Sequence, residues 1–157
     1  MEFHNISPIF DKNSKILILG SFPSSKSREQ KFFYAHPQNR FWKVISTITN
    51  EKLPISTDDK KELLLRNNIA VWDVIKSCDV IGSSDSSIEN VVINDFSIIF
   101  SNANIRRIYA NGNKAYSLFR KLYSKDVEIF KLPSTSPANA QYSLESLCKE
   151  WSAILGE

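Results

Sequence analysis

The sequence predicts a three-layer α/β/α fold with a central four-stranded parallel sheet. Short apolar runs alternate along the chain with amphipathic segments, the pattern of parallel strands joined by crossover helices. The run at 15–20 is continuous and ends in glycine, as expected for a strand buried on both faces. Three later runs, 69–72, 105–110 and 127–132, have the length of further strands. The last two alternate more between apolar and polar residues, which favours positions at or near a sheet edge.

Five segments have the apolar spacing of amphipathic helices. They span 41–48, 57–66, a segment from 94 or 95 to 102, 113–123 and 143–155. Asp58 and Asp59 stand near the start of the second segment, where the helix dipole favours acids. No internal repeat or long linker interrupts the alternation, so we expect residues 1–157 to form one domain.

Composition excludes several classes of protein. Apolar residues make up 42% of the 157 residues and charged residues 24%, which is typical of a globular chain. No apolar run approaches the ~18–20 residues of a membrane span, and no signal peptide is visible, so we expect a cytoplasmic protein that does not contact membranes. Cys78 and Cys148 fit no metal-ligand spacing and are expected to be buried thiols. With no dinucleotide or P-loop motif either, we expect no metal and no cofactor.

The charge is unevenly distributed along the chain. Residues 1–43 carry seven Lys or Arg against three acids, and 103–131 carry seven against two, whereas 44–102 and 132–157 are net acidic. Such blocks are usually solvated faces. Alternatively, the two basic segments converge in the fold to meet a phosphate backbone.

Small, polar or proline-containing segments follow all four expected strands. They are 20–24, Asp73, 111–114 and 133–139. Ligands of open parallel sheets bind beyond the carboxyl ends of the strands, so these segments are expected to converge on one site. Neither His4 nor His36 stands in a readable Ser/His/Asp arrangement. The site is therefore expected to work with amides, hydroxyls, aromatic rings and one carboxylate.

Two motifs, in the expected order, carry a family resemblance. Residues 19–24 (LGSFPS) with 34–42 (YAHPQNRFW) resemble the first motif region of the uracil-DNA glycosylase superfamily, and the HPxNRFW string is also similar to its mismatch-specific uracil/thymine branch. Residues 132–139 (LPSTSPAN) are similar to the second motif of the hypoxanthine-DNA (deoxyinosine) glycosylase branch. Residues 72–74 and 82–86 also match that branch, so the resemblance covers nearly the whole chain.

The resemblance implies a uracil-DNA glycosylase-like fold and a monofunctional DNA glycosylase of base excision repair. Such an enzyme hydrolyses the N-glycosidic bond of a flipped deaminated base, here hypoxanthine in preference to uracil or xanthine. The implied partner is DNA containing deaminated bases, and we expect a monomer. Iron–sulfur branches of the superfamily use four cysteines, so two cysteines imply no iron–sulfur cluster. The alternatives are a catalytically weak damaged-DNA-binding module on the same fold and, more weakly, a small-nucleoside hydrolase.

The resemblance moves the catalytic role away from its usual place. In several branches an Asn of the first motif positions the attacking water, but Phe22 stands there and is expected to stack on the base. Catalysis is then assigned to Asn39, whose side-chain carbonyl would hold the water; alternatively, Asn39 caps the helix that begins near Arg40. His36 either donates to the departing base or bonds backbone within its own loop.

The remaining site residues follow from the same resemblance. An ionised Asp73 would accept a ring N–H of the base, or else cap a loop or pair with a lysine. The base pocket is expected to comprise Gly20, Ser21, Phe22, Pro23, Tyr34, Asp73 and Asn111. DNA contacts are expected from Ser24, Asn113, Lys114, Ser134, Thr135, Ser136 and Asn139. Without the resemblance, residues 134–136 would be an ordinary turn.

Overall fold

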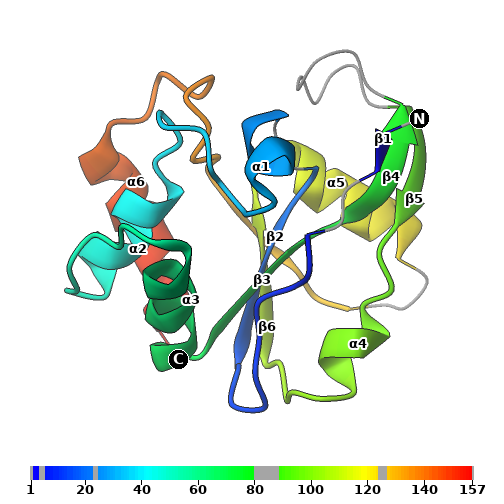
Figure 1. The fold of residues 1–157 in the computed structure, drawn as a ribbon, viewed down its shortest axis with the longest axis horizontal. Coiled ribbons are helices and arrows are strands. Elements are labelled where there is room, and N and C mark those ends of the chain that lie inside the picture. Colours follow the sequence, from blue (N-terminus) through cyan, green and yellow to red (C-terminus); the bar gives the residue numbers. More distant parts are fainter. Residues whose placement is uncertain (1, 4–5, 23–24, 80–88, 124–126, 157) are drawn as a thin grey trace.

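A four-stranded parallel sheet forms the centre of the protein. The computed structural model describes residues 2–3, 6–22, 25–79, 89–123 and 127–156. Within them the sheet has the order β3-β2-β6-β7, and every neighbouring pair is parallel (Figure 1). The strands are β2 (Ile16–Gly20), β3 (Ile69–Asp73), β6 (Arg107–Asn111) and β7 (Phe130–Leu132). The predicted parallel sheet is confirmed.

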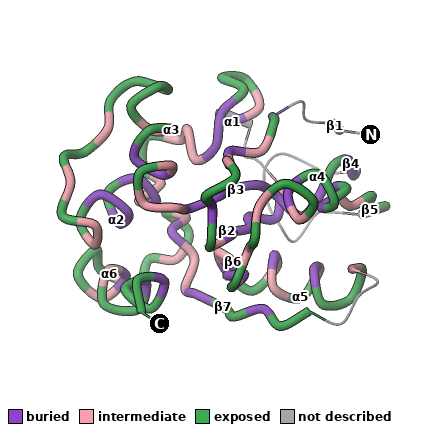
Figure 2. Tube along the Cα trace, turned by 90° about the horizontal axis from the view of Figure 1, so that it is seen from below, coloured by how far each residue is buried: buried purple, intermediate pink, exposed green. Residues whose placement is uncertain are grey.

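Helices cover both faces of this sheet. Figure 2 shows α2, α3 and α6 on one side and α4 and α5 on the other. Their bounds are α2 (Phe41–Ile48), α3 (Thr57–Arg66), α4 (Ser97–Phe100), α5 (Asn113–Leu122) and α6 (Leu144–Trp151), and a 3-10 turn, Ser152–Leu155, extends α6. The predicted three-layer arrangement is therefore confirmed.

Burial along the strands follows their place in the sheet. In β2 the side chains of Leu17, Ile18 and Leu19 are completely buried, as the continuous apolar run predicts. Strand β3 lies at an edge and is nevertheless buried throughout. Its outer edge is covered by Ile9, which exchanges two backbone hydrogen bonds with Val71 at 3.0 and 2.9 Å.

A second, smaller sheet was not predicted. It is antiparallel, with the order β1-β4-β5, and its strands are β1 (Glu2–Phe3), β4 (Ile75–Asp79) and β5 (Glu89–Ile93). Strand β4 follows β3 after one residue, so the sequence carries no turn signal to separate them. The buried amide of Asn94 holds this junction by donating to the carbonyl of Asp73 at 2.9 Å.

Three further predictions on local structure were incomplete. The short helix α1 (Ser25–Gln30) was not predicted. The segment expected to reach residue 102 contains only the four-residue α4, and it begins after Asn94, which is tied to Asp73, and Asp95, which accepts the N–H of Ser97 at 3.0 Å. The strand expected at 127–132 is regular only over its last three residues.

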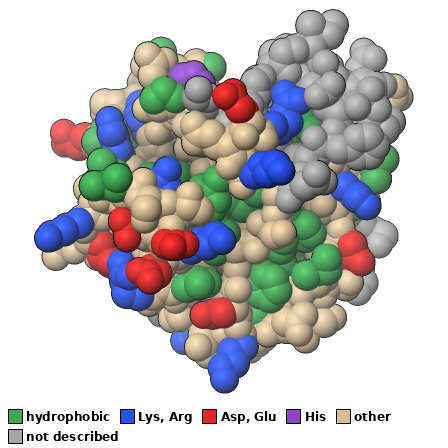
Figure 3. Space-filling model, viewed as in Figure 1, with side chains coloured by type: hydrophobic (Ala, Val, Ile, Leu, Met, Phe, Trp, Pro, Cys, Tyr) green, Lys and Arg blue, Asp and Glu red, His purple; other side chains and the backbone are tan. Residues whose placement is uncertain are grey.

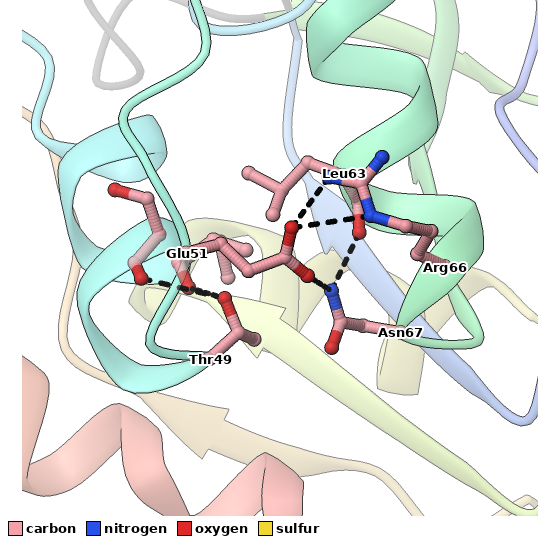
Figure 4. A network of polar contacts seen from close by, with 7 residues as sticks. Thr49, Glu51, Leu63, Arg66 and Asn67 are labelled. Atoms are coloured by element: carbon pink, nitrogen blue, oxygen red, sulfur yellow. Dashed lines mark hydrogen bonds and ion pairs between the residues drawn. The ribbon is translucent and has the colours of Figure 1, made fainter.

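A polar network joins the loop after α2 to the end of α3 (Figure 4). Glu51 accepts from Arg66 and, at 2.7 Å, from Asn67, which also donates to the carbonyl of Leu63 at 2.7 Å. The hydrogen bonds from Arg66 and then Asn67 hold the pKa of Glu51 below its ordinary value. The network closes the α2–α3 connection at the surface.

Candidate active site

A hollow of about 880 Å³ opens at the carboxyl ends of the four parallel strands, within the size range of small-molecule sites. Asp73 at the end of β3 and the segments that follow β2, β6 and β7 contribute to its wall. The loop before α2 adds to it, and this loop and the loop after β7 both lie at the upper end of the sheet in Figure 1. The expected convergence of the strand ends is present in the structure.

Most of the residues expected from the sequence line this hollow. They are Gly20, Ser21, Phe22, Tyr34, Asn39, Asp73, Asn111, Asn113, Ser134, Thr135, Ser136 and Asn139. His36 and Lys114 do not line it, and Pro23, Ser24 and residues 82–86 lie outside the described residues. Sequence reasoning missed Ser27, Lys131, Gln141, Tyr142 and Glu150, which stand outside the motif positions singled out and line the wall through the fold.

The floor of the hollow brings a carboxylate and a phenol together over a glycine. Gly20 lies opposite Asp73 in the β2–β3 register, and Asp73 is only 3% exposed. A Cβ on Gly20 would lie 2.5 Å from Oδ1 of Asp73 and 3.0 Å from the hydroxyl oxygen of Tyr34. Since real Cβ atoms do not approach oxygen so closely, these two groups occupy the space that any larger residue at position 20 would need.

Aromatic rings form part of the wall. The ring of Tyr34 stacks on Phe41 with centroids 4.1 Å apart, and the backbone of Tyr34 has a φ of 51°, a left-handed conformation that is strained for a bulky residue. Phe22 lines the hollow, and the guanidinium carbon of Arg28 lies 5.1 Å from its ring centroid. Packing on both residues thus orders the apolar surface that a planar ligand would meet.

Thr135 lies at the centre of a chain of hydrogen bonds that joins Asn111, Thr135 and Asn39 in the wall of the hollow, called the relay below. Its side chain is fully buried, its N–H donates to Oδ1 of Asn111 at 3.0 Å, and its hydroxyl oxygen accepts from Nδ2 of Asn111 at 3.0 Å. The same hydroxyl donates to Oδ1 of Asn39 at 2.8 Å. Thr135 therefore connects the end of β6 to the loop before α2, and this burial does not suit the DNA contact expected of it.

The carbonyl of Asn39 is already engaged. Besides the Thr135 hydroxyl it accepts the N–H of Phe41 at 2.9 Å, in the first turn of α2. The N-cap residue of α2 is Arg40, so Asn39 stands one residue before the cap and satisfies the first N–H of the helix rather than capping it in the usual way. Asn39 also lines the hollow, so this backbone contact and access to a ligand coexist in one side chain.

The loop of residues 134–142 is held by Arg40. The Arg40 guanidinium donates to the carbonyls of Tyr142, Asn139 (3.0 Å) and Ser136 (3.4 Å), and its N–H donates to the carbonyl of Thr135 at 3.1 Å. Hydrogen bonds from a charged donor to three carbonyls order the loop strongly. Sequence reasoning identified the loop but not this clamp.

Contacts within the loop leave donors at its surface. Oγ of Ser134 accepts the N–H of Ser136 at 3.1 Å, and Oγ of Ser136 accepts the N–H of Ala138 at 3.2 Å. Each hydroxyl still has its proton to donate, and both residues line the hollow. Nδ2 of Asn139 is used within the loop, where it donates to the carbonyl of Ser134 at 3.0 Å.

His36 and Lys114 stand apart from the hollow. Nδ1 of His36 accepts the N–H of Gln38 at 3.1 Å, the contact within its own loop that was the alternative to a catalytic role. Lys114 lies in the first turn of α5, which Gly112 precedes with a φ of 98°. A Cβ at Gly112 would meet Cβ of Ser134 at 3.2 Å, so glycine allows α5 to approach the loop.

Comparison with known proteins identifies the family. The family model of the uracil DNA glycosylase superfamily matches residues 7–155. The chain belongs to this superfamily. It is 36% identical over 153 residues to a protein of Methanosarcina barkeri named hypoxanthine DNA glycosylase, covering 96% of each chain. It is 37% identical over 148 residues to a protein of the same name from Methanosarcina acetivorans, covering 93% of each.

A solved structure shares the fold of this superfamily member. A solution NMR structure from Methanosarcina acetivorans, provisionally described as a uracil DNA glycosylase, matches with a TM-score of 0.82 and 35% identity over 96% of this chain and 94% of that one. In the described part of the present chain, no group of three or more His, Cys, Asp or Glu side chains is arranged to hold a metal ion. Of the helices described, none is long and apolar enough to cross a membrane.

Proposed function

We propose that this protein is a DNA glycosylase that hydrolyses the N-glycosidic bond of a deaminated base flipped out of DNA, with hypoxanthine preferred over uracil and xanthine. The observation that carries the proposal is the hollow at the carboxyl edge of the sheet, which Asp73, Tyr34 and Asn39 line in a member of this superfamily. Relatives named hypoxanthine DNA glycosylase, similar over almost the whole chain, support the choice of base.

We assign base recognition to Asp73 at the floor of the hollow and to the aromatic rings in its wall. A carboxylate accepts hydrogen bonds only, so Asp73 suits the ring N–H that hypoxanthine, xanthine and uracil all present. Adenine offers a ring nitrogen lone pair at the corresponding position and would be repelled. Phe22 and Tyr34 supply apolar faces for the extruded base, and such stacking is worth roughly 1–3 kcal/mol per base.

Bond cleavage is assigned to a dissociative hydrolysis. The deoxyribose develops cationic character as negative charge builds on the departing base, and water then completes the reaction. Preorganised donors near the base lower this barrier. The hydroxyls of Ser134 and Ser136, with Asn113 at the start of α5, are proposed to hold the phosphates that flank the flipped nucleotide.

Three features of the protein follow as parts of this proposal. We propose a monomer that needs no metal or iron–sulfur cluster, in which Cys78 is buried in the core and Cys148 is half-buried. We also propose a cytoplasmic location, because the two free cysteines would stay reduced in that compartment.

A base-release panel tests the proposal. Duplex oligonucleotides that contain one hypoxanthine, uracil or xanthine are incubated with the protein under single-turnover conditions, and abasic sites are cleaved with alkali. We expect hypoxanthine to be released fastest and Asn39→Ala to lower that rate by at least ~10²-fold. Tight binding of all three duplexes without strand breaks would instead support a damaged-DNA-binding module, and activity confined to free deoxyinosine would support a nucleoside hydrolase.

A further inference from the structure

The orientation of the Asn39 side chain is fixed by the protein itself. The N–H of Phe41 can only donate, so the Asn39 atom that faces it at 2.9 Å is the amide oxygen and not the nitrogen. The Thr135 hydroxyl fills the second lone pair of that oxygen at 2.8 Å. An attacking water on this oxygen would have to displace one of the two donors.

The direction of the Thr135 proton is fixed in the same way. The N–H of Thr135 requires the oxygen of Asn111 to face it at 3.0 Å, which turns Nδ2 of Asn111 toward the Thr135 hydroxyl, also at 3.0 Å. With its oxygen accepting from Asn111, the hydroxyl sends its one proton to Asn39. Two backbone N–H groups, at Thr135 and at Phe41, thus set the direction of every bond in the relay.

The group of Asn39 left for a ligand is its Nδ2. Asn39 lines the hollow, and within the described part of the chain its Nδ2 donates to no protein acceptor. The relay therefore leaves Asn39, a lining residue, with a hydrogen-bond donor to offer a ligand, in place of the acceptor expected from the sequence.

We infer that Asn39 acts in the proposed base release as a hydrogen-bond donor, through Nδ2, to a carbonyl oxygen or ring nitrogen of the departing base, and that Thr135 and Asn111 are positioning residues for it. Negative charge grows on these base atoms as the glycosidic bond breaks, so a donor that the relay holds in place stabilises the transition state more than the bound substrate. The inference depends on the proposed function and specifies the role of one of its residues.

Asn39→Asp is the decisive variant, because it changes the hydrogen-bonding character of position 39 with almost no change in shape. A carboxylate still accepts from Phe41 and Thr135 but has no donor. We expect Asn39→Asp to release hypoxanthine at least ~10²-fold more slowly than the unaltered chain, in the range of Asn39→Ala, under single-turnover conditions with saturating protein. A water-positioning role predicts the opposite, since a carboxylate is the better acceptor for a water proton.

A second pair of variants tests the relay. Thr135→Val keeps the shape of the side chain and removes its hydroxyl, whereas Thr135→Ser keeps the hydroxyl. We expect Thr135→Val to lower the rate of base release ~3–10-fold, as the loss of one neutral hydrogen bond would, and Thr135→Ser to stay close to the unaltered chain. Melting temperatures of all four variants separate this effect from loss of folding. A purely structural role would make the rates follow the melting temperatures, without rescue by serine.

The outcomes are distinguishable. Three results together support the inference: the unaltered chain releases hypoxanthine, Asn39→Asp is folded but releases it slowly, and Thr135→Ser keeps the rate that Thr135→Val loses. Near-normal release by Asn39→Asp, beside an active unaltered chain, would overturn the donor role and leave the proposed function standing. If the unaltered chain releases none of the three bases, the proposed function is overturned and this inference with it.

Discussion

The two ends of the parallel sheet carry hollows of different construction. At the carboxyl end, the wall is made of buried or half-buried groups that bond one another, such as Thr135, Asn111 and Asn39. At the amino end, a hollow of about 290 Å³ is lined by Lys12, Lys15 and Arg106 together with asparagine amides. Its segments are tied by backbone bonds, such as Arg106 N–H to the Lys15 carbonyl at 2.7 Å.

The comparison shows that the cluster of cationic side chains and the network of hydrogen-bonded polar groups lie at opposite ends of the sheet. The basic segments 1–43 and 103–131 bring three cations, Lys12, Lys15 and Arg106, together at the end of the sheet away from the candidate active site. The same two segments also supply Arg28, which packs on Phe22, and Lys131 at the active-site hollow. Among the described residues that line the active-site hollow, the cationic side chain is Lys131. On the face seen in Figure 3, acidic and basic side chains are interspersed around α2 and α3. Chemistry is thus expected where polar groups are buried and oriented.

The largest effect that would test this comparison is expected at the floor of the carboxyl-end hollow. Asp73→Asn keeps the shape of a side chain that is 3% exposed but exchanges an acceptor oxygen for an N–H₂ group. We expect hypoxanthine release to fall by ~10²–10³-fold, because the ring N–H of the base would then face a donor. Single-turnover rates and melting temperatures measure the effect. Asp58→Asn, an exposed position on α3, is the matched control, and equal losses in both variants would contradict the role of Asp73.

An intermediate effect is expected at the loop clamp. Arg40→Met keeps the aliphatic length and removes the donors to three loop carbonyls, so we expect the free energy of unfolding to fall by about 2–3 kcal/mol and base release to fall about tenfold. Urea denaturation and single-turnover assays measure the two effects. Arg66→Met is the control, since its ion pair with Glu51 lies at the surface, where solvent screening leaves it little effect on stability. If both variants lose the same stability and activity, the clamp has no special role.

The smallest effect is expected at the amino-end hollow. Replacing Lys12, Lys15 and Arg106 together by Gln removes three charges, yet we expect base release and its salt dependence to stay within about twofold, because the groups lie at the opposite end of the sheet. Lys131→Gln, in the active-site hollow, is the comparison and should reduce the salt slope of DNA binding by about 1. A large loss of binding in the triple variant would mean that DNA contacts both ends.

The sequence predicted the parts of the molecule that depend on local pattern. The continuous apolar run at 15–20 and the polar segments after each strand led to the parallel sheet and to Asp73 at the carboxyl ends of its strands, whereas Asn39 followed from the family resemblance. The relay could not be predicted, because in the sequence Thr135 is one of three hydroxyl residues in a turn and nothing there shows that it is fully buried. Its partners at 39 and 111 are distant in sequence, and only the fold shows which lone pairs they fill. The Arg40 clamp was missed for the same reason.

The short pairing of Ile9 with Val71 has a further consequence for how molecules of this protein meet one another. A bare edge strand is a template on which another chain can add its own strand. On the β3 side that template is already occupied, since Ile9 uses both the N–H and the carbonyl of Val71. The other edge, β7, is only three residues long and exposes Lys131. Sheet extension from molecule to molecule is thereby discouraged at both borders, which favours solubility at high concentration.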